Sequence, residues 1–161
     1  MLFACAACGS AITGPLTELA EIPARPMDQG YPTDSGTRTA SATVPRGSFA
    51  VEPEPWGAPF VPCEDPVAIF PGAPCVCDPD GDDFLVSAGP RWTVVLHPGD
   101  APGLEPVRAP SFDDVGCCGL SGRGGMIRRC PCGSPVGTEI SDCSTPYELH
   151  LDPGQVHQLT V

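Results

Sequence analysis

The sequence predicts a mainly β fold, in which a small antiparallel sheet is surrounded by long loops. Short runs of β-branched and aromatic residues are separated by Gly and Pro, and no stretch keeps a 3.6-residue apolar period. The 161 residues include 22 prolines and 19 glycines, which interrupt regular structure often. Because a chain of this length ordinarily builds one hydrophobic core, we expect a single domain over residues 1–161.

The strongest strand is expected at residues 91–97 (RWTVVLH), which are rich in β-branched and aromatic side chains and are followed by Pro98 and Gly99. Residues 147–151 alternate polar and apolar side chains, as strands do. Residues 16–22 fit either one helical turn or a short strand. Similar patterns predict further strands at residues 11–13, 48–52, 67–70, 84–86 and 156–161. At this spacing the strands would form an antiparallel meander or a small sandwich.

Residues 14–115 are expected to form a proline-rich β insertion between the two ends of the chain. Within it, residues 25–46 have few large apolar side chains and many turn formers, which predicts an exposed, flexible loop. Residues 53–62 (PEPWGAPFVP) predict an extended segment anchored by Trp56 and Phe60.

The charge and the apolar pattern exclude several classes of protein. The net charge is −12 and all eight basic residues are arginines, so general nucleic-acid binding is disfavoured. No run approaches the roughly 20 apolar residues of a membrane span, and the first residues lack the positive start of a secretory signal. We therefore expect a cytoplasmic protein without membrane contact, in which clustered thiols are metal ligands rather than disulfides.

Two cysteine pairs share the same surroundings. Residues 5–12 read CAACGSAI and residues 130–136 read CPCGSPV, so each pair is followed by Gly-Ser, a small residue and a β-branched one. Four thiolates suit the tetrahedral coordination of a structural Zn²⁺. The sequence predicts one zinc site made of Cys5, Cys8, Cys130 and Cys132. The second pair is one residue shorter than usual, so Cys117, Cys118 or Cys143 is an alternative to Cys130.

The six remaining cysteines suggest a second zinc site that would use only some of them. They are Cys63, Cys75, Cys77, Cys117, Cys118 and Cys143. Cys63, Cys75 and Cys77 would supply three ligands and a later thiol the fourth. The side chains of Cys117 and Cys118 are expected to diverge, with one facing a metal and the other the core. The alternative for each of the six is a buried free thiol.

Two further motifs carry less chemistry. Residues 77–83 resemble a calcium loop in their alternating aspartates but lack its glutamate, so we interpret them as an acidic turn. Residues 119–125 are glycine-rich but lack the Gly-Lys-Ser/Thr of a phosphate-binding loop. The arginines nearby are Arg123, Arg128 and Arg129, which we expect to pair with the surplus carboxylates at a hairpin tip.

The cysteine motifs together resemble those of a group of small, uncharacterised bacterial zinc-ribbon-like proteins. They read CAACG at residues 5–9, GCCG at 116–119, CPCG at 130–133 and SDC at 141–143. The resemblance implies metal binding and no particular reaction. The expected fold is thus a small, loop-rich antiparallel sheet domain with a zinc-ribbon-like metal site. This site would join an N-terminal knuckle, residues 1–13, to a C-terminal one, residues 116–146.

The sequence favours a structural-zinc protein that binds another protein through loop residues such as Trp56 and Phe60. Closing a loop of more than a hundred residues through one ion would couple zinc binding to folding. One alternative is a protein that stores or senses zinc or copper. A second is an enzyme that uses Cys117, Cys118 or Cys143 with one of the three histidines, which are His97, His150 and His157. Neither H-E-x-x-H nor the zinc-deaminase signature occurs.

Overall fold

A seven-stranded mixed sheet forms the body of the protein. The computed structural model describes residues 1–26, 31–32, 38–63, 76–77, 84–143 and 145–160. In order across the sheet the strands are β10 (Glu105–Pro106), β11 (Arg128–Arg129), β12 (Pro135–Ile140), β13 (Glu148–Leu151), β9 (Thr93–Leu96), β5 (Ser48–Glu52) and β2 (Thr17–Glu18). The pair β2 and β5 is parallel and the other pairs are antiparallel. The expected mainly β class is confirmed.

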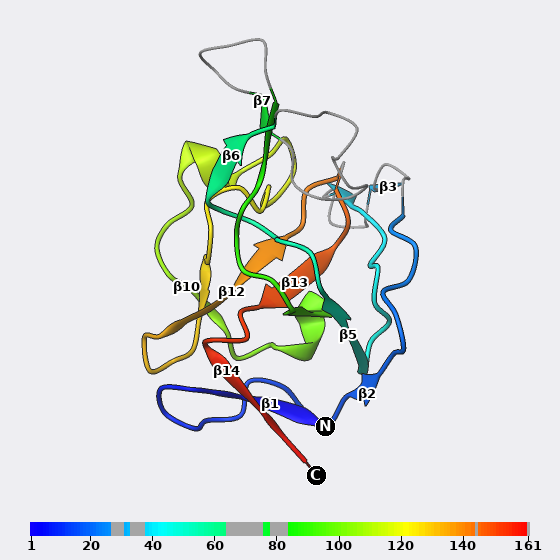
Figure 1. Ribbon diagram of the computed structural model, residues 1–161, viewed down its shortest axis with the longest axis vertical. Helices are drawn as coiled ribbons and strands as arrows, with labels where there is room; N and C mark the ends of the chain where they lie inside the picture. The colour runs from blue at the N-terminus through cyan, green and yellow to red at the C-terminus, as the bar shows by residue number, and fades with distance from the viewer. Residues whose placement is uncertain (27–30, 33–37, 64–75, 78–83, 144, 161) are drawn as a thin grey trace.

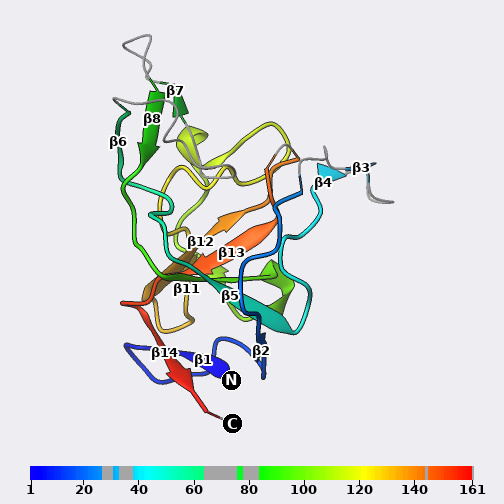
Figure 2. The ribbon, with the colours of Figure 1, turned by 45° about the vertical axis from the view of Figure 1, so that its right-hand side comes forward.

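Three smaller sheets and two short 3-10 helices complete the described fold. They are the pair β1 (Leu2–Cys5) and β14 (Val156–Leu159), the pair β3 (Tyr31–Pro32) and β4 (Arg38–Thr39), the three strands β6 (Phe60–Pro62), β8 (Phe84–Ser87) and β7 (Val76–Cys77), and the 3-10 helices η2 (Pro98–Asp100) and η3 (Phe112–Asp114). Figures 1 and 2 show β1 and β14 at one end of the molecule, with both chain termini, and β6, β7 and β8 at the other. Antiparallel pairing of Leu2 with Leu159 ties the two ends of the chain together.

Most of the strands expected from the sequence are present. The predictions for residues 48–52, 84–86, 91–97, 147–151 and 156–161 are confirmed in β5, β8, β9, β13 and β14. Residues 16–22 contain the short strand β2 and not a helical turn. Residues 11–13 form only a single bridge, between Ala11 and Ala4. The prediction for residues 67–70 lies outside the described residues. In the large sheet the expected meander is limited to β10, β11, β12 and β13, because β13 then pairs with β9.

The main core lies on one face of the large sheet and continues onto β1. Phe3 in β1 meets Phe49 in β5 edge to face, with ring centroids 4.9 Å apart. β9 is buried along its whole length between β5 and β13. The core cluster comprises Phe3, Cys5, Ile12, Leu16, Phe49, Val94, Leu96, Ala101, Cys130, Val136, Leu149, Leu151 and Val156. Two cysteines are therefore part of the apolar core itself.

The second face of β13 is also buried, although it carries the polar residues Glu148 and His150. Glu148 and His150 are as inaccessible as their apolar neighbours. His150 Nε2 lies 2.7 Å from Glu148 Oε2, and His150 Nδ1 lies 2.9 Å from Thr93 Oγ1. Arg25 donates to Glu148 Oε1 (3.0 Å) and to Glu52 Oε2 (2.8 Å). The buried charges are thus paired, as burial requires.

The protonation of this pair follows from its surroundings. Burial lowers the pKa of His150, which favours the neutral ring. Burial works to raise the pKa of Glu148, but the hydrogen bond from His150 and the charge of Arg25 hold it below its ordinary value. A neutral His150 therefore accepts from the Thr93 hydroxyl and donates to an ionised Glu148.

Trp56 is buried, which corrects the expectation that it is an exposed binding residue. Its side chain is 1% exposed and stacks on the His150 ring, with centroids 4.1 Å apart and planes 7° from parallel. The Arg25 guanidinium lies 4.5 Å from the centre of the Trp56 ring. A large aromatic surface that covers a charged network excludes water from it.

The expectation of an exposed loop at residues 25–46 is wrong for several of its members. Arg25 reaches the buried carboxylates, and Ala40, Thr43 and Val44 are buried. Thr43 also donates a hydrogen bond to Glu148. Residues 27–30 and 33–37 lie outside the described residues. Paired charges, and not only apolar side chains, hold this segment against the sheet.

The two tryptophans allow a matched test of the core. We expect Trp56→Ala to lower the free energy of unfolding by about 3–5 kcal/mol, because it empties a buried site. Trp92 is 61% exposed, so Trp92→Ala should change stability by about 0.5 kcal/mol or less. Urea denaturation measures both, and equal losses would contradict the placement of Trp56.

A second matched pair tests the buried charges. Arg25→Ala leaves two buried carboxylates without their guanidinium, and we expect it to cost about 3–5 kcal/mol of unfolding free energy. Arg91 forms an exposed pair with Glu54 (3.3 Å), so Arg91→Ala should cost about 1 kcal/mol at most. The measurement is again denaturant unfolding. A stable Arg25→Ala protein would show that the pairs are not needed to hold residues 25–44 in place.

Candidate metal centre

The first cysteine pair lies in the turn that follows β1. The Cys5 amide donates to the Ser10 carbonyl (2.9 Å), and the Gly9 amide donates back to the Cys5 carbonyl (2.8 Å). Gly9 has φ +75°, a conformation that residues with a Cβ atom rarely adopt. The glycine after the second cysteine therefore closes the turn, and Cys5 and Cys8 face the same side.

The second pair lies in the turn between β11 and β12 and repeats this pattern with one residue fewer. The Cys130 amide donates to the Ser134 carbonyl (2.9 Å), and the Gly133 amide donates to the Cys130 carbonyl (2.8 Å). Gly133 has φ +96°. The Gly-Ser that follows each cysteine pair thus closes the turn by the same backbone hydrogen bonds in both places.

The two turns bring four sulfur atoms together. Cys5 Sγ lies 3.7 Å from Cys132 Sγ, and Cys8 Sγ lies 3.6 Å from Cys130 Sγ. All four lie within 4.8 Å of one another. An ion bound by four thiolates at about 2.3 Å in a regular tetrahedron would separate its sulfurs by about 3.8 Å. The donor set and its spacing therefore fit a tetrahedral metal ion.

The four thiols differ in burial and in acidity. Cys5 and Cys130 are buried in the core, whereas Cys8 and Cys132 are exposed. Hydrogen bonds from the Ser10 side chain and amide lower the pKa of Cys8 to about 6. Burial raises the pKa of Cys130 to about 12. Without a cation the core would hold Cys130 as a thiol, and a bound metal would reverse that preference.

A second group joins Cys117, Cys118, Cys143 and Asp142, whose ligand atoms also lie within 4.8 Å of one another. Cys117 Sγ lies 3.1 Å from Cys118 Sγ and 3.2 Å from Cys143 Sγ. The expectation that the two adjacent side chains diverge is wrong, since their sulfurs meet and both cysteines are exposed. Asp142 was not anticipated, because no cysteine-spacing rule points to it.

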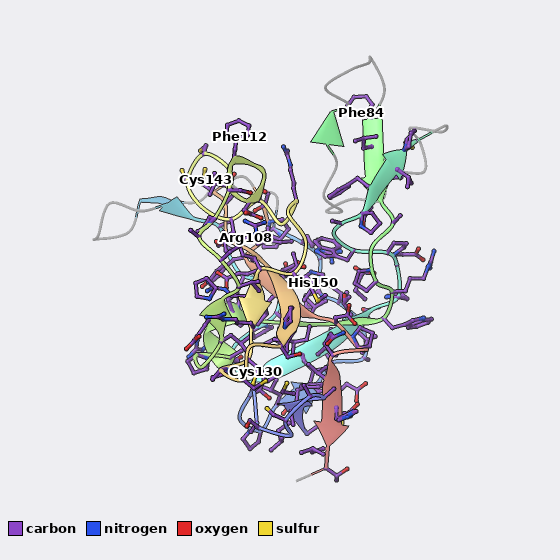
Figure 3. The ribbon with its side chains drawn as sticks, turned by 90° about the vertical axis from the view of Figure 1, so that its left-hand side faces the viewer. Phe84, Arg108, Phe112, Cys130, Cys143 and His150 are labelled. Carbon is purple, nitrogen blue, oxygen red and sulfur yellow. The ribbon has the colours of Figure 1, made fainter. Side chains whose placement is uncertain are left out.

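Figure 3 places the two groups at opposite ends of the molecule, with Cys130 beside the β1 end and Cys143 near Phe112 and Arg108. β12 connects them, because it begins after the Cys130–Cys132 turn and ends before Asp142. Its six residues span about 20 Å. The two groups are therefore separate sites.

The remaining expected ligands fall elsewhere. Cys63 follows β6, where its amide donates to the Phe84 carbonyl (2.8 Å). It belongs to neither of the two groups found among the described residues. Cys75 lies outside the described residues, as does the side chain of Cys77, so the proposed trio of these three cysteines stays a prediction. The acidic turn expected at residues 77–83 also falls there, apart from the Cys77 backbone in β7.

The arginines and histidines are occupied by other contacts. Arg128 Nε donates to Glu139 (2.6 Å) and Arg129 to Glu105 (3.2 Å), which agrees with the expected pairing with carboxylates. His150 contacts Thr93 and Glu148, and His97 Nδ1 accepts from the Gly99 amide (2.9 Å). His157 lies in β14, beside β1. These contacts give His150 and His97 structural roles, whereas His157 is exposed.

A hollow of about 300 Å³ lies beside the second group. Its lining includes Pro106, Pro110, Val115, Gly119, Leu120, Ile127, Arg128, Glu139 and Ser141. Three exposed apolar residues line it or lie within two residues of its lining: Phe112 (91% exposed), Val115 and Met126. Asp114 accepts hydrogen bonds from Arg108 and Ser111 and holds this segment in place. The Arg108 contact lowers the pKa of Asp114 to about 2.

Comparison of the chain with protein-family models, with curated proteins and with solved structures finds no match in any of the three. None of the described helices has the length and apolar character needed to cross a membrane. The geometry of the two cysteine groups is therefore the evidence for their chemistry.

Metal binding to the first group should release protons. The Cys130 thiol, with its pKa raised to about 12, is protonated at pH 7 until a cation binds, whereas Cys8 is already ionised. We expect calorimetric zinc titration in two buffers of different ionisation enthalpy to show at least one proton released per ion, and zinc affinity to fall as the pH falls. Ser10→Ala removes a hydrogen bond that lowers the Cys8 pKa, so it should increase the proton count. Zinc binding with no buffer dependence would contradict this assignment.

Proposed function

We propose that the protein is a structural-zinc protein, in which Cys5, Cys8, Cys130 and Cys132 hold one Zn²⁺ between the two ends of the chain. The observation that carries the proposal is the meeting of these four sulfurs at spacings of 3.6 and 3.7 Å, near a tetrahedral edge. Four-thiolate tetrahedral sites are those of zinc and of single iron ions, and zinc is the usual structural ion. A reducing compartment such as the cytoplasm would keep the thiols available.

The ion would contribute directly to folding. Cys5 and Cys130 are 0% and 1% exposed and belong to the main core. The sulfur contacts join residues that are 127 and 122 positions apart, so one ion would close nearly the whole chain into a loop. Pairing of β1 with β14 acts at the same end of the molecule. Zinc binding would thus stabilise the native fold by its own binding free energy.

The biological role we propose is binding to another protein. Its support is the hollow, whose lining includes the exposed Val115, and the exposure of two further apolar residues close to that lining in the chain, Phe112 and Met126. This surface replaces Trp56, which is buried, while Phe60 in β6 is half-buried. Exposed apolar patches beside a hollow are typical of interaction sites.

The enzyme alternative has less support. The hydrogen bond between Cys117 and Cys118 contributes most to the raised pKa of Cys117, which disfavours a nucleophilic thiolate. Two of the histidines are committed to Thr93, Glu148 and Gly99. The metal-handling alternative is favoured by one observation, the exposure of Cys117 and Cys118 in the second group.

Zinc content and stability test the proposal together. We expect the purified protein to carry zinc, and Cys132→Ser to lose one zinc ion per chain. The same variant should lose about 3 kcal/mol or more of stability, which lowers the melting midpoint by about 6–12 °C in a chain of this size. Cys117→Ser replaces an equally exposed cysteine outside the site and should leave the midpoint unchanged. Iron in place of zinc, or a Cys132→Ser protein with unchanged metal content and midpoint, would refute the assignment.

A further inference from the structure

Each of the two groups has two exposed and two buried members, but these members are arranged differently. Cys117 and Cys118 are exposed, and Cys143 with Asp142 is buried behind them. In the first group the first cysteine of each turn, Cys5 or Cys130, is buried in the core. The second group therefore presents two adjacent thiols, those of Cys117 and Cys118, to solvent.

The turn that contains Cys117 and Cys118 packs closely against residues 141 and 142. The amides of Cys118 and Gly119 both donate to Asp142 Oδ1, at 2.7 and 3.1 Å. A Cβ atom on Gly116 would lie 2.5 Å from Asp142 Cγ, and one on Gly119 would lie 2.3 Å from the Ser141 carbonyl oxygen. Both glycines of the G-C-C-G motif are thus needed for the turn to rest against residues 141 and 142.

The group offers three sulfur donors and, as its fourth candidate ligand, the Asp142 carboxylate, whose Oδ1 already accepts two backbone hydrogen bonds. A structural zinc ion requires a fourth ligand. Thiolates are soft ligands that select Cu(I), and this monovalent ion is satisfied by three of them. The sulfur spacings of 3.1 and 3.2 Å would widen on binding, which rotation of the exposed side chains permits.

We propose that Cys117, Cys118 and Cys143 form an exchangeable three-thiolate site for Cu(I), distinct from the zinc site at the other end of β12. Asp142 is a positioning residue in this site. Two exposed sulfurs let an incoming thiol contact the ion and pass it on by ligand exchange, with no change in oxidation state. The protein would then accept and release copper while its zinc stays in place.

The test is a titration of the zinc-loaded protein with Cu(I) under anaerobic conditions, against a chromogenic Cu(I) chelator. We expect one Cu(I) to bind per chain, with near-ultraviolet thiolate-to-copper absorption, three sulfurs by X-ray absorption and full retention of the zinc. Cys117→Ser should weaken Cu(I) binding by more than about 100-fold, and Cys143→Ser should do the same. Cys143 is buried, so its variant could misfold. The proposal is therefore judged by Cys117→Ser, which replaces an exposed residue.

Asp142→Asn tests whether Asp142 positions the turn or binds the ion. Its amide oxygen still accepts from both backbone amides, so Cu(I) affinity should stay within about 10-fold of the parent protein. The proposal is overturned if Cu(I) displaces the zinc instead of adding to it, or if Cys117→Ser binds Cu(I) as well as the parent. It is also overturned if purified protein holds a second zinc that Cys117→Ser removes. Loss of the first-site zinc in Cys132→Ser is measured separately, so failure of one proposal does not imply failure of the other.

Discussion

The fold depends on how four sulfur atoms are accommodated at the base of one hydrophobic core. Cys5 and Cys130 sit among Phe3, Val136 and Leu151, where water cannot solvate a thiolate. Two ionised thiols in such surroundings would repel each other strongly, and neutral thiols would bond only weakly. A cation would remove this conflict, because it would bind all four sulfurs and let the two buried ones ionise inside the core. The four-cysteine site, the core and the pairing of the chain ends are therefore one structural unit.

The sequence reveals this unit because its signals are local. The turn after each cysteine pair needs a glycine with positive φ, and Gly9 and Gly133 stand at the corresponding positions. The strands with continuous β-branched residues, such as β9, were equally predictable from their own side chains. Each of these features is decided by neighbouring residues, which a single sequence displays directly.

What the sequence did not reveal depends on residues that meet only in space. The alternation of residues 147–151 predicts a strand, but it does not show that Arg25 and Trp56 come from distant segments to cover Glu148 and His150. A carboxylate can be buried when it pairs with a guanidinium group. That partner cannot be predicted from the residues next to the carboxylate in the sequence. Asp142 was missed for the same reason, since its role arises from amides more than 20 positions earlier. Burial of charge is thus the property that single-sequence patterns predict least well here.

The placement of the two cysteine groups follows from β12, which pairs with β11 on one side and β13 on the other. A strand held on both sides keeps its ends apart, here by about 20 Å. The Debye length at physiological ionic strength is about 8 Å, so charge that appears on one group is largely screened at the other. Loading one site with a cation therefore leaves the thiols of the other almost unaffected. In our proposals the donor sets then distinguish the groups: the four sulfurs of the first would retain an ion that supports the fold, whereas the second, with exposed sulfurs on two adjacent residues, would exchange one.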